Sequence, residues 1–298
     1  MNCWYGNHKT NINVYAECLK RLQKNNIITI PAGDINRSLY FGDPIFGTIK
    51  HIYINNFENS IIEYDETHEI IIDLINKTIH TNNINKAHDE LIKIQSRLQL
   101  RHGKFEHEFP EQKMSVKFLT GDESVLEIGG NIGRNTLVIS SILKDDTKLV
   151  SIECDIDNYK KLNENKILNG KRFHTELCAL SKNKLIQKDW DTLPSDVLLD
   201  GYKWVNTITL QDFREKYKIQ FDTLVLDCEG AFYYILMDMP EILNNINLII
   251  VENDYLEIPH KEYVDTVLKK NGFYVDYVKS GGIYKHPCRD NFFEVWKK

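Results

Sequence analysis

Residues 124–135, which read S-V-L-E-I-G-G-N-I-G-R-N, constrain the fold of this 298-residue chain more than any other stretch. Val125, Leu126 and Ile128 predict a short apolar strand, and the residues after Gly133 predict a helix. Glycines permit a sharp turn from strand to helix and let a ligand approach the backbone, because they carry no Cβ. N–H groups at the start of a helix favour an electron-rich ligand. The stretch therefore predicts a nucleotide-type pocket at the carboxyl end of the first strand of an open α/β sheet.

The type of nucleotide follows from two patterns that the chain lacks. A dinucleotide fingerprint G-x-G-x-x-G starting at Gly129 needs glycine at 131 and a small residue at 134, where the chain has asparagine and arginine. No P-loop pattern occurs either. The order of Glu127, Gly129, Asn131 and Gly133 instead resembles motif I of class I S-adenosylmethionine-dependent methyltransferases. That resemblance implies that these four residues hold the methionine end of the cofactor, and a purely structural turn is the alternative.

From about residue 118 the chain alternates short apolar runs with helical periodicity, which predicts a Rossmann-like α/β domain with a parallel sheet. Strands are expected at 125–128, 149–153, 173–177, 223–227, 248–252, 274–278 and 292–296. Helices are expected near 134–143, 157–169, 210–217, 231–237 and 260–271. Seven strands ending in a closely spaced pair resemble the methyltransferase sheet, whose last strand is inserted antiparallel.

The first part of the chain has a different pattern and predicts a small accessory module. Residues 27–30, 48–54 and 69–72 alternate apolar and polar side chains as strands do, and residues 60–74 suggest a hairpin. Aromatic residues such as Tyr5 and Phe41 could form a sugar-stacking surface, but the core of a small β unit is the simpler interpretation. We therefore expect a β-rich module at 1–80, a helical linker at 81–117 and the methyltransferase domain at 118–298.

Two further strand ends supply candidate cofactor contacts. Glu153 ends the second strand, 20 residues beyond Gly133, where a carboxylate can accept hydrogen bonds from both hydroxyls of a ribose. A solvent-exposed acid is the alternative there, and Asp155 is expected to cap the next helix. The third strand runs into Cys178-Ala179-Leu180-Ser181, where Ala179 would lie in the floor of an adenine pocket.

The strongest resemblance appears at the fourth strand, which ends L-D-C-E-G-A at residues 226–231. Together with E-I-G-G-N-I-G, I-E-C-D and C-A-L-S, this box resembles the FkbM-type methyltransferases over residues 118–296. The resemblance implies a class I enzyme that O-methylates sugar or polyketide hydroxyls. Val225 and Phe232 depart from the family pattern near the expected acceptor pocket, whereas Gly130, where the family often has alanine, is a harmless change.

Three acids are candidates for catalysis: Asp227 and Glu229 after the fourth strand, and Glu252 after the fifth. Methyl transfer to a hydroxyl benefits from a base that takes the proton as the new bond forms. Neighbouring carboxylates raise one another's pKa, which suits such a base. Ordering of the glycine loop by Asp227 and helix capping by Glu229 or Glu252 are the structural alternatives. The same acids could hold a divalent metal, which we do not favour, and His260 is a weaker candidate for the base.

The overall composition limits the partners. A net charge of −6 argues against nucleic acid, because a phosphate-binding domain usually carries a basic excess. No C-x-x-C pair, secretory signal or apolar run of membrane-spanning length is apparent, so we expect no membrane association and a reduced, cytoplasmic location.

The leading hypothesis is an O-methyltransferase acting on a hydroxyl of a sugar or glycan precursor, with S-adenosylmethionine as cofactor. One alternative keeps the cofactor but methylates another small molecule or a peptide. The other is a carbohydrate-binding protein that retains the methyltransferase fold without catalysis. The sequence gives no indication of the oligomeric state.

Overall fold

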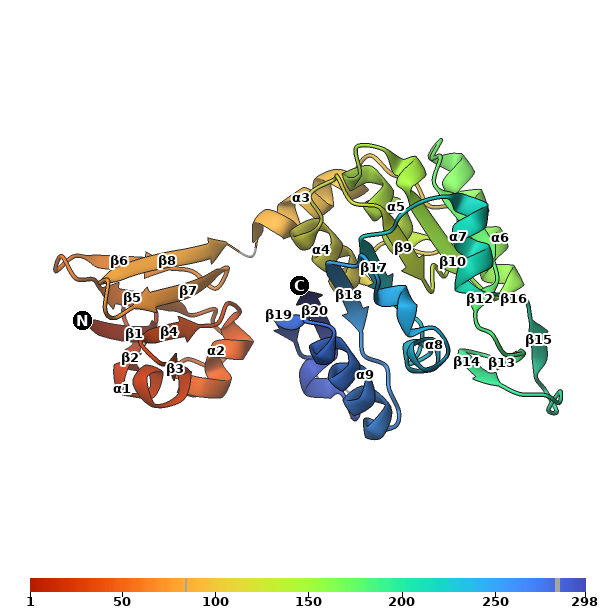
Figure 1. Ribbon diagram of the computed structural model, residues 1–298. Coiled ribbons are helices and arrows are strands. Elements are labelled where there is room, and N and C mark those ends of the chain that lie inside the picture. Colours follow the sequence, from red (N-terminus) through yellow and green to blue (C-terminus); the bar gives the residue numbers. More distant parts are fainter. Residues whose placement is uncertain (84, 282–284) are drawn as a thin grey trace. The chain divides into compact units, whose positions relative to one another are not determined.

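The computed structural model describes residues 1–83, 85–281 and 285–298, which group into two units, Met1–Asp89 and Glu90–Lys298. Figure 1 shows the helices and strands of both units. The smaller unit has a hydrophobic core of its own, and the larger unit has its main cores on the two faces of a large sheet. Whereas the sequence suggests boundaries at residues 80 and 117, the structure has one boundary, between Asp89 and Glu90. The functional roles assigned to these parts remain predictions.

The smaller unit consists of two antiparallel four-stranded sheets and short helical segments. One sheet has the order β2 (Asn11–Asn13), β1 (Asn2–Gly6), β5 (His51–Asn55), β6 (Ile61–Tyr64). The other has the order β3 (Gln23–Lys24), β4 (Ile27–Ile30), β7 (His68–Asp73), β8 (Thr78–Asn83). The helical segments are α1 (Tyr15–Glu17), the π-helical turn Cys18–Leu22 and α2 (Asp34–Phe41). The predicted β-rich character of this part is confirmed.

Side chains at alternate positions of the central strands form the core of the smaller unit. Ile28 and Ile30 of β4 pack with Ile70 and Ile72 of β7, as the period of two requires. Tyr5 and Phe41 lie in the same core with their ring centroids 5.5 Å apart, so the core interpretation of these aromatics is confirmed.

The predicted hairpin at 60–74 is wrong. β6 pairs with β5 in one sheet, whereas β7 pairs with β4 and β8 in the other. The turn at 65–67 therefore connects two sheets, because the alternating isoleucines of β7 are buried against β4 rather than against β6.

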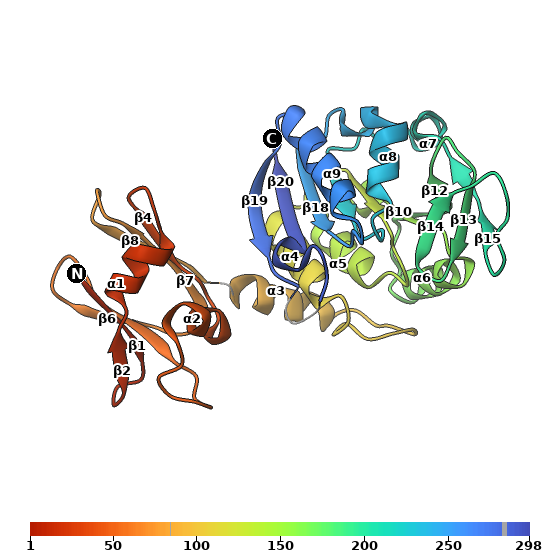
Figure 2. The same ribbon diagram turned by 90° about the horizontal axis from the view of Figure 1, so that it is seen from below.

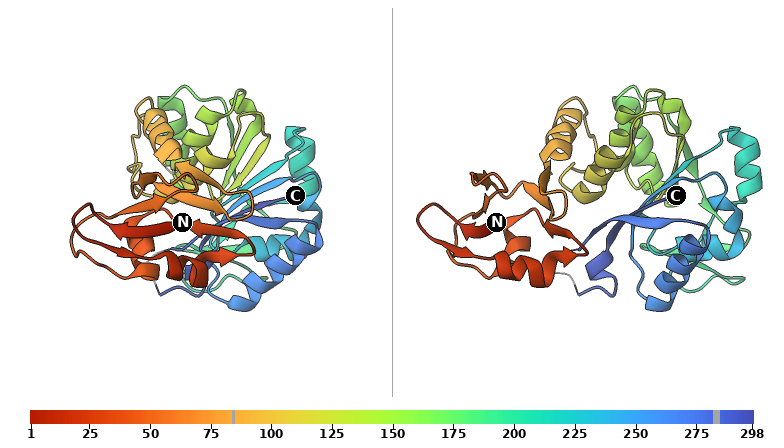
Figure 3. Two further views of the ribbon diagram at one scale, coloured as in Figure 1. Left: turned by 90° about the vertical axis from the view of Figure 1, so that its left-hand side faces the viewer. Right: turned by 60° about the vertical axis from the view of Figure 1, so that its left-hand side comes forward.

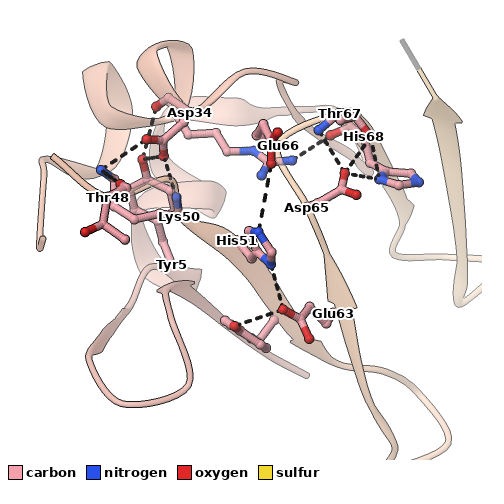
Figure 4. A network of polar contacts seen from close by, with 12 residues as sticks. Tyr5, Asp34, Thr48, Lys50, His51, Glu63, Asp65, Glu66, Thr67 and His68 are labelled. Atoms are coloured by element: carbon pink, nitrogen blue, oxygen red, sulfur yellow. Dashed lines mark hydrogen bonds and ion pairs between the residues drawn. The ribbon is translucent and has the colours of Figure 1, made fainter. Parts of the chain in front are cut away.

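Figure 4 shows a network of polar contacts in the smaller unit. Asp34 accepts a hydrogen bond from the Tyr5 hydroxyl and forms an ion pair with the buried ammonium of Lys50, at 3.1 Å. Near it, His51 Nδ1 lies 2.6 Å from a carboxylate oxygen of Glu63. The first two contacts connect α2 with β1 and with the residue that precedes β5, and the third connects β5 with β6.

Replacing Arg37 with methionine should destabilise the smaller unit by about 2 kcal/mol, because two backbone carbonyls would lose their donor. Arg37 is completely buried and donates to the carbonyls of Pro31 and His68, at 2.9 and 2.6 Å. Amide hydrogens of β4 and β7 should then exchange roughly 30-fold faster. The control is Arg21→Met, because exposed Arg21 also donates to two carbonyls. Equal exchange rates in the two variants would contradict the prediction.

The larger unit is built on a seven-stranded sheet, as the sequence predicts. Its order is β11 (His174–Leu177), β10 (Leu149–Glu153), β9 (Val125–Ile128), β17 (Thr223–Leu226), β18 (Leu248–Glu252), β20 (Phe293–Lys297), β19 (Tyr274–Lys279). The strands β9, β10, β11, β17 and β18 are paired in parallel, and β20 is antiparallel to both neighbours. The expected antiparallel insertion of the last strand is confirmed, and Figure 3 shows the twist of the sheet.

Helices cover both faces of this sheet (Figure 2). On one face lie α7 (Leu210–Tyr217), α8 (Phe232–Asp238) and α9 (Ile258–Lys270), packed on residues such as Leu126 and Leu224. On the other lie α4 (Phe109–Phe118), α5 (Arg134–Ile142) and α6 (Ile156–Leu168), packed on residues such as Val125 and Val225. Successive residues of each strand point to opposite faces, which explains why the central strands β9, β17 and β18 are mainly apolar in sequence.

The helical character predicted for the start of the linker is confirmed by α3 (Asn85–Gln95), which continues into this unit, where Leu91 and Ile94 pack on Val138 of α5. Two other parts of the larger unit were not predicted as such. One is α4, which lies in the segment interpreted as a linker. Between β11 and α7, two small sheets pair β12 (Ala179–Leu180) with β16 (Thr207–Ile208), and β13 (Leu185–Lys188) with β14 (Asp191–Pro194) and β15 (Lys203–Val205). Among the described residues, no helix combines the length and the apolar character that crossing a membrane requires.

Candidate functional site

A cavity of about 330 Å³ lies at the edge of the sheet where the parallel strands end. Because the carboxyl ends of parallel strands meet at one edge, residues far apart in the sequence converge there. The start of α4 and the β13–β14 hairpin complete the walls. The lining includes Glu108, Glu111, Gly129, Asn131, Glu153, Cys178, Ala179, Leu180, Gln187, Trp190, Asp227, Glu229, Tyr234, Glu252 and Phe293.

Most residues predicted to form a site are brought together in this cavity. Those that line it are Gly129, Asn131, Glu153, Ala179, Asp227, Glu229 and Glu252. Glu127 and Gly133 lie outside the lining, and His260 stacks on Tyr233 with ring centroids 3.8 Å apart. The functions of these residues remain predictions.

Gly129 lets the glycine loop touch the neighbouring strand end. Its φ is +92°, and an added Cβ would lie 1.6 Å from the carbonyl oxygen of Asp227. The N–H groups of Gly129 and Gly130 both donate to the carbonyl of Ile152, at 3.0 and 2.9 Å. The loop is therefore fixed to the ends of β10 and β17, and its backbone forms part of the cavity wall.

Glu127 lies behind the glycine loop. Its carboxyl accepts hydrogen bonds from the hydroxyls of Thr136 and Ser151, both at 2.6 Å. Burial raises its pKa to about 7, because the charged form loses its hydration. Glu127 thus connects β9 with α5 and β10 and does not line the cavity.

Glu153 faces the cavity and is held by backbone donors. One carboxylate oxygen accepts from the N–H of Asn131 at 2.8 Å and the other from the N–H of Asp155 at 2.6 Å. Burial raises its pKa to about 7 despite these donors. Each oxygen keeps a further lone pair, so the carboxylate can still accept hydrogen bonds from a ligand. Asp155 caps α6 by accepting from the N–H groups of Asp157 and Asn158, as predicted.

Several carboxyl groups that line the cavity lie close enough to raise one another's pKa. Glu252 and Glu111 both line the cavity, and the pKa of Glu252 lies well above its usual range. Burial is the main cause, and the neighbouring carboxyl groups of Glu111 and Asp227 raise this pKa further. Burial also raises the pKa of Asp227, with repulsion from Glu108 as the next cause. These acids retain protons at pH values where ordinary carboxyls have lost them.

Glu108 and Glu111 are site residues that sequence reasoning missed. Glu108 precedes α4 and forms an ion pair with Arg134 and a hydrogen bond with the Asn131 side chain, at 3.0 Å. Glu111 lies in the first turn of α4. The signal that could have identified this helix is Pro110, because proline is favoured in the first turn of a helix.

The cavity wall also includes the small and apolar residues that follow β11. Cys178, Ala179 and Leu180 lie there together with Gln187 and Trp190 from the β13–β14 hairpin. The sequence analysis missed the contribution of this hairpin.

Among the described residues, every side chain of the cavity lining that can carry a full charge near neutral pH is a carboxyl group. The part of the chain that the structure describes thus contributes no lysine, arginine or histidine to the lining. Nor does the described part of the chain contain a group of three or more histidine, cysteine, aspartate or glutamate side chains placed to hold a metal. The carboxyl groups that line the cavity are Glu108, Glu111, Glu153, Asp227, Glu229 and Glu252.

No protein-family profile and no curated protein sequence matches the chain. Solved structures do match, at low similarity. The O-methyltransferase from Bacillus cereus in complex with SAH has 12% identity and a TM-score of 0.41, over 72% of this chain and 91% of that one. The ribosomal protein L11 methylase from Lactobacillus delbrueckii subsp. bulgaricus has 13% identity and a TM-score of 0.39, over 66% and 79%. TYW2 of M. jannaschii in complex with AdoMet has 14% identity and a TM-score of 0.35, over 82% and 96%.

The larger unit has the class I methyltransferase fold. Its strand order and the antiparallel strand β20 between β18 and β19 are those of this fold. The comparisons do not identify the FkbM-type family, so that resemblance remains a prediction.

Proposed function

We propose that this chain is an S-adenosylmethionine-dependent methyltransferase that O-methylates a hydroxyl group of a sugar or glycan precursor. The observation that carries the proposal is the cavity at the carboxyl edge of the sheet, lined by six carboxyl groups and by no basic side chain among the described residues. Such a lining favours a positively charged ligand. It disfavours nucleic acid as the acceptor, because phosphates would meet carboxylates.

The residues of the cavity fit this cofactor. Glu153 has lone pairs left for the two ribose hydroxyls, and Ala179 lies among small residues that can floor the adenine. The backbone at Gly129 is open to close approach by the methionine part, since no Cβ blocks it. The carboxyl groups around Asp227 can balance a sulfonium and an ammonium.

When bound, the cofactor supplies a methyl group on a positively charged sulfur. Transfer breaks the carbon–sulfur bond, forms a carbon–oxygen bond and releases the proton of the acceptor hydroxyl. Asp227, Glu229 and Glu252 are the candidates to take that proton. Burial raises the pKa of Asp227 and of Glu252, which makes each a stronger base once it has lost its own proton. The protein otherwise aligns the acceptor, which is the larger part of catalysis for such a displacement. The resemblance of the D-C-E-G box to FkbM-type enzymes supports a hydroxyl acceptor.

Calorimetric titration with S-adenosylmethionine and S-adenosylhomocysteine tests the proposal. We expect micromolar binding by the wild type and roughly 30-fold weaker binding by Glu153→Gln, because hydrogen bonds to a charged group are lost. The matched control is Glu123→Gln, since Glu123 also accepts from two backbone N–H groups, of Thr120 and Gly121, but lies outside the cavity. A folded wild type that binds neither compound would exclude the cofactor and with it the proposed function.

A further inference from the structure

The β13–β14 hairpin turns one of its faces toward the cavity. Leu185 lies opposite Pro194, and two residues further along β13, Gln187 lies opposite Thr192. Residues directly opposite each other, and residues two apart on one strand, point to the same side of a sheet. These four residues line the cavity, whereas Ile186, which points to the other side, does not. One face of the hairpin is therefore part of the cavity wall.

Two contacts place this wall beside Glu153. The hydroxyl oxygen of Thr192 lies 3.9 Å from the Sγ atom of Cys154. Lys203 of β15, the other strand that pairs with β13, forms an ion pair with Asp155. Cys154 and Asp155 directly follow Glu153, which is proposed to bind the ribose. Because a base is bonded directly to its ribose, the hairpin adjoins the place where the base of the cofactor would lie.

Gln187 brings a polar group without a partner into this wall. The residue is only 4% exposed, and its Oε1 atom accepts no hydrogen bond within the described part of the chain. The polar side chains opposite it, Thr192 and Lys203, make the contacts described above instead. A buried amide oxygen without a donor costs free energy that a donor on a ligand would recover. The last torsion of a glutamine side chain is soft, so this oxygen can turn toward a ligand in the cavity.

We propose that Gln187 selects the adenine base of the cofactor, with its Oε1 atom accepting a hydrogen bond from the exocyclic amino group. A glutamine amide matches this edge of adenine, because its oxygen accepts from the amino group while its nitrogen can donate to a ring nitrogen. Cys178, Ala179 and Leu180 supply the apolar surface for the faces of the base. The inference rests on the proposed function and adds a residue that determines its cofactor specificity.

The test compares two ligands by calorimetric titration of the full-length chain. One is S-adenosylhomocysteine, and the other is its analogue in which hydrogen replaces the exocyclic amino group of the base. We expect the wild type to bind S-adenosylhomocysteine roughly 10-fold more tightly, in line with one hydrogen bond to a buried acceptor. Gln187→Met keeps the length of the side chain but offers no amide oxygen. This variant should bind the two ligands with equal affinity.

Leu185→Ala is the matched control, because Leu185 lines the cavity from the same face of the hairpin and has no polar group. It should weaken the binding of both ligands alike and leave the roughly 10-fold preference unchanged. The comparison of the two ligands on the wild type needs no variant, so it holds even if a substitution disturbs the hairpin.

Equal affinities of the wild type for the two ligands would overturn the inference, and so would a preference that survives in folded Gln187→Met. In both cases S-adenosylhomocysteine still binds, so the proposed function stands and only the role of Gln187 fails. If the folded wild type binds neither ligand, the proposed function fails and this inference fails with it.

Discussion

Replacing Gly129 with alanine is expected to weaken binding of S-adenosylhomocysteine by at least roughly 100-fold, because small displacements of a site can cost this much. The added Cβ would lie 1.6 Å from the carbonyl oxygen of Asp227. Either the glycine loop or the end of β17 must therefore move, and both line the cavity. Calorimetric titration of the variant measures the affinity, and near-ultraviolet circular dichroism shows whether the core stays packed.

Gly272→Ala is the matched control for this variant. Gly272 has a φ of +86°, close to that of Gly129, but no atom lies within 4 Å of an added Cβ. The control therefore isolates the cost of a left-handed backbone at alanine, about 1 kcal/mol. It should bind S-adenosylhomocysteine like the wild type. If Gly129→Ala binds equally well, the glycine loop does not shape the cofactor site and the cavity needs another explanation.

The sheet of the larger unit was predictable because its strands are buried on both faces. Residues of β9, β10 and β17 are all buried, so the sequence shows mainly apolar runs of strand length, and the polar exceptions Glu127 and Ser151 are hydrogen-bonded to each other. Each run ends in glycine or acidic residues, which identified the edge that carries the cavity. Glu153 and Asp227 could be predicted to lie near each other, because both follow parallel strands, whose carboxyl ends meet at one edge of the sheet.

Helix α4 was not predictable in the same way. Because the helix was missed, Glu111, which lines the cavity from its first turn, was missed as well. Its buried residues are Glu111, Gln112, Met114 and Ser115, so polar side chains occupy its inner face and no apolar periodicity appears. Gln112 is buried because its amide donates to the carbonyls of Phe105, His107 and Glu108. A helix whose buried residues are polar, because they bond to a nearby turn or line a cavity, shows no apolar periodicity and is therefore interpreted as a linker.

The inserted strands β12–β16 were missed for a different reason. They are two to four residues long. β13 pairs with β14 across a short turn, and with β15 from farther along the chain, so that Gln187 lies opposite both Thr192 and Lys203. Strand propensity in such short segments depends on the partner strand, which the local sequence does not specify. The wrong hairpin in the smaller unit has the same origin, because the pattern of β6 and β7 does not reveal that they join different sheets.

The buried acids predict that the free energy of unfolding of the larger unit falls as the pH rises. The pKa of Glu127 is about 7 in the folded state, against 4.5 as its ordinary value. The folded state therefore holds a proton that the unfolded state releases. This stabilisation is complete below pH 4.5 and is lost by about pH 7. It amounts to about 3 kcal/mol, and Glu153 contributes in the same direction.

Urea unfolding of the wild type and of Glu127→Gln across this pH window tests the prediction. Glutamine does not titrate, so the variant should lose about 3 kcal/mol less stability than the wild type between the two limits. Glu123→Gln is the control, because hydrogen bonds lower the pKa of Glu123 in the folded state, so that its contribution is lost only as the pH falls. The free energy of unfolding of Glu123→Gln should therefore change with pH as that of the wild type does near pH 7. A Glu127→Gln curve parallel to that of the wild type would mean that Glu127 is ionised in the folded protein and that the acids around the cavity carry more negative charge than inferred above.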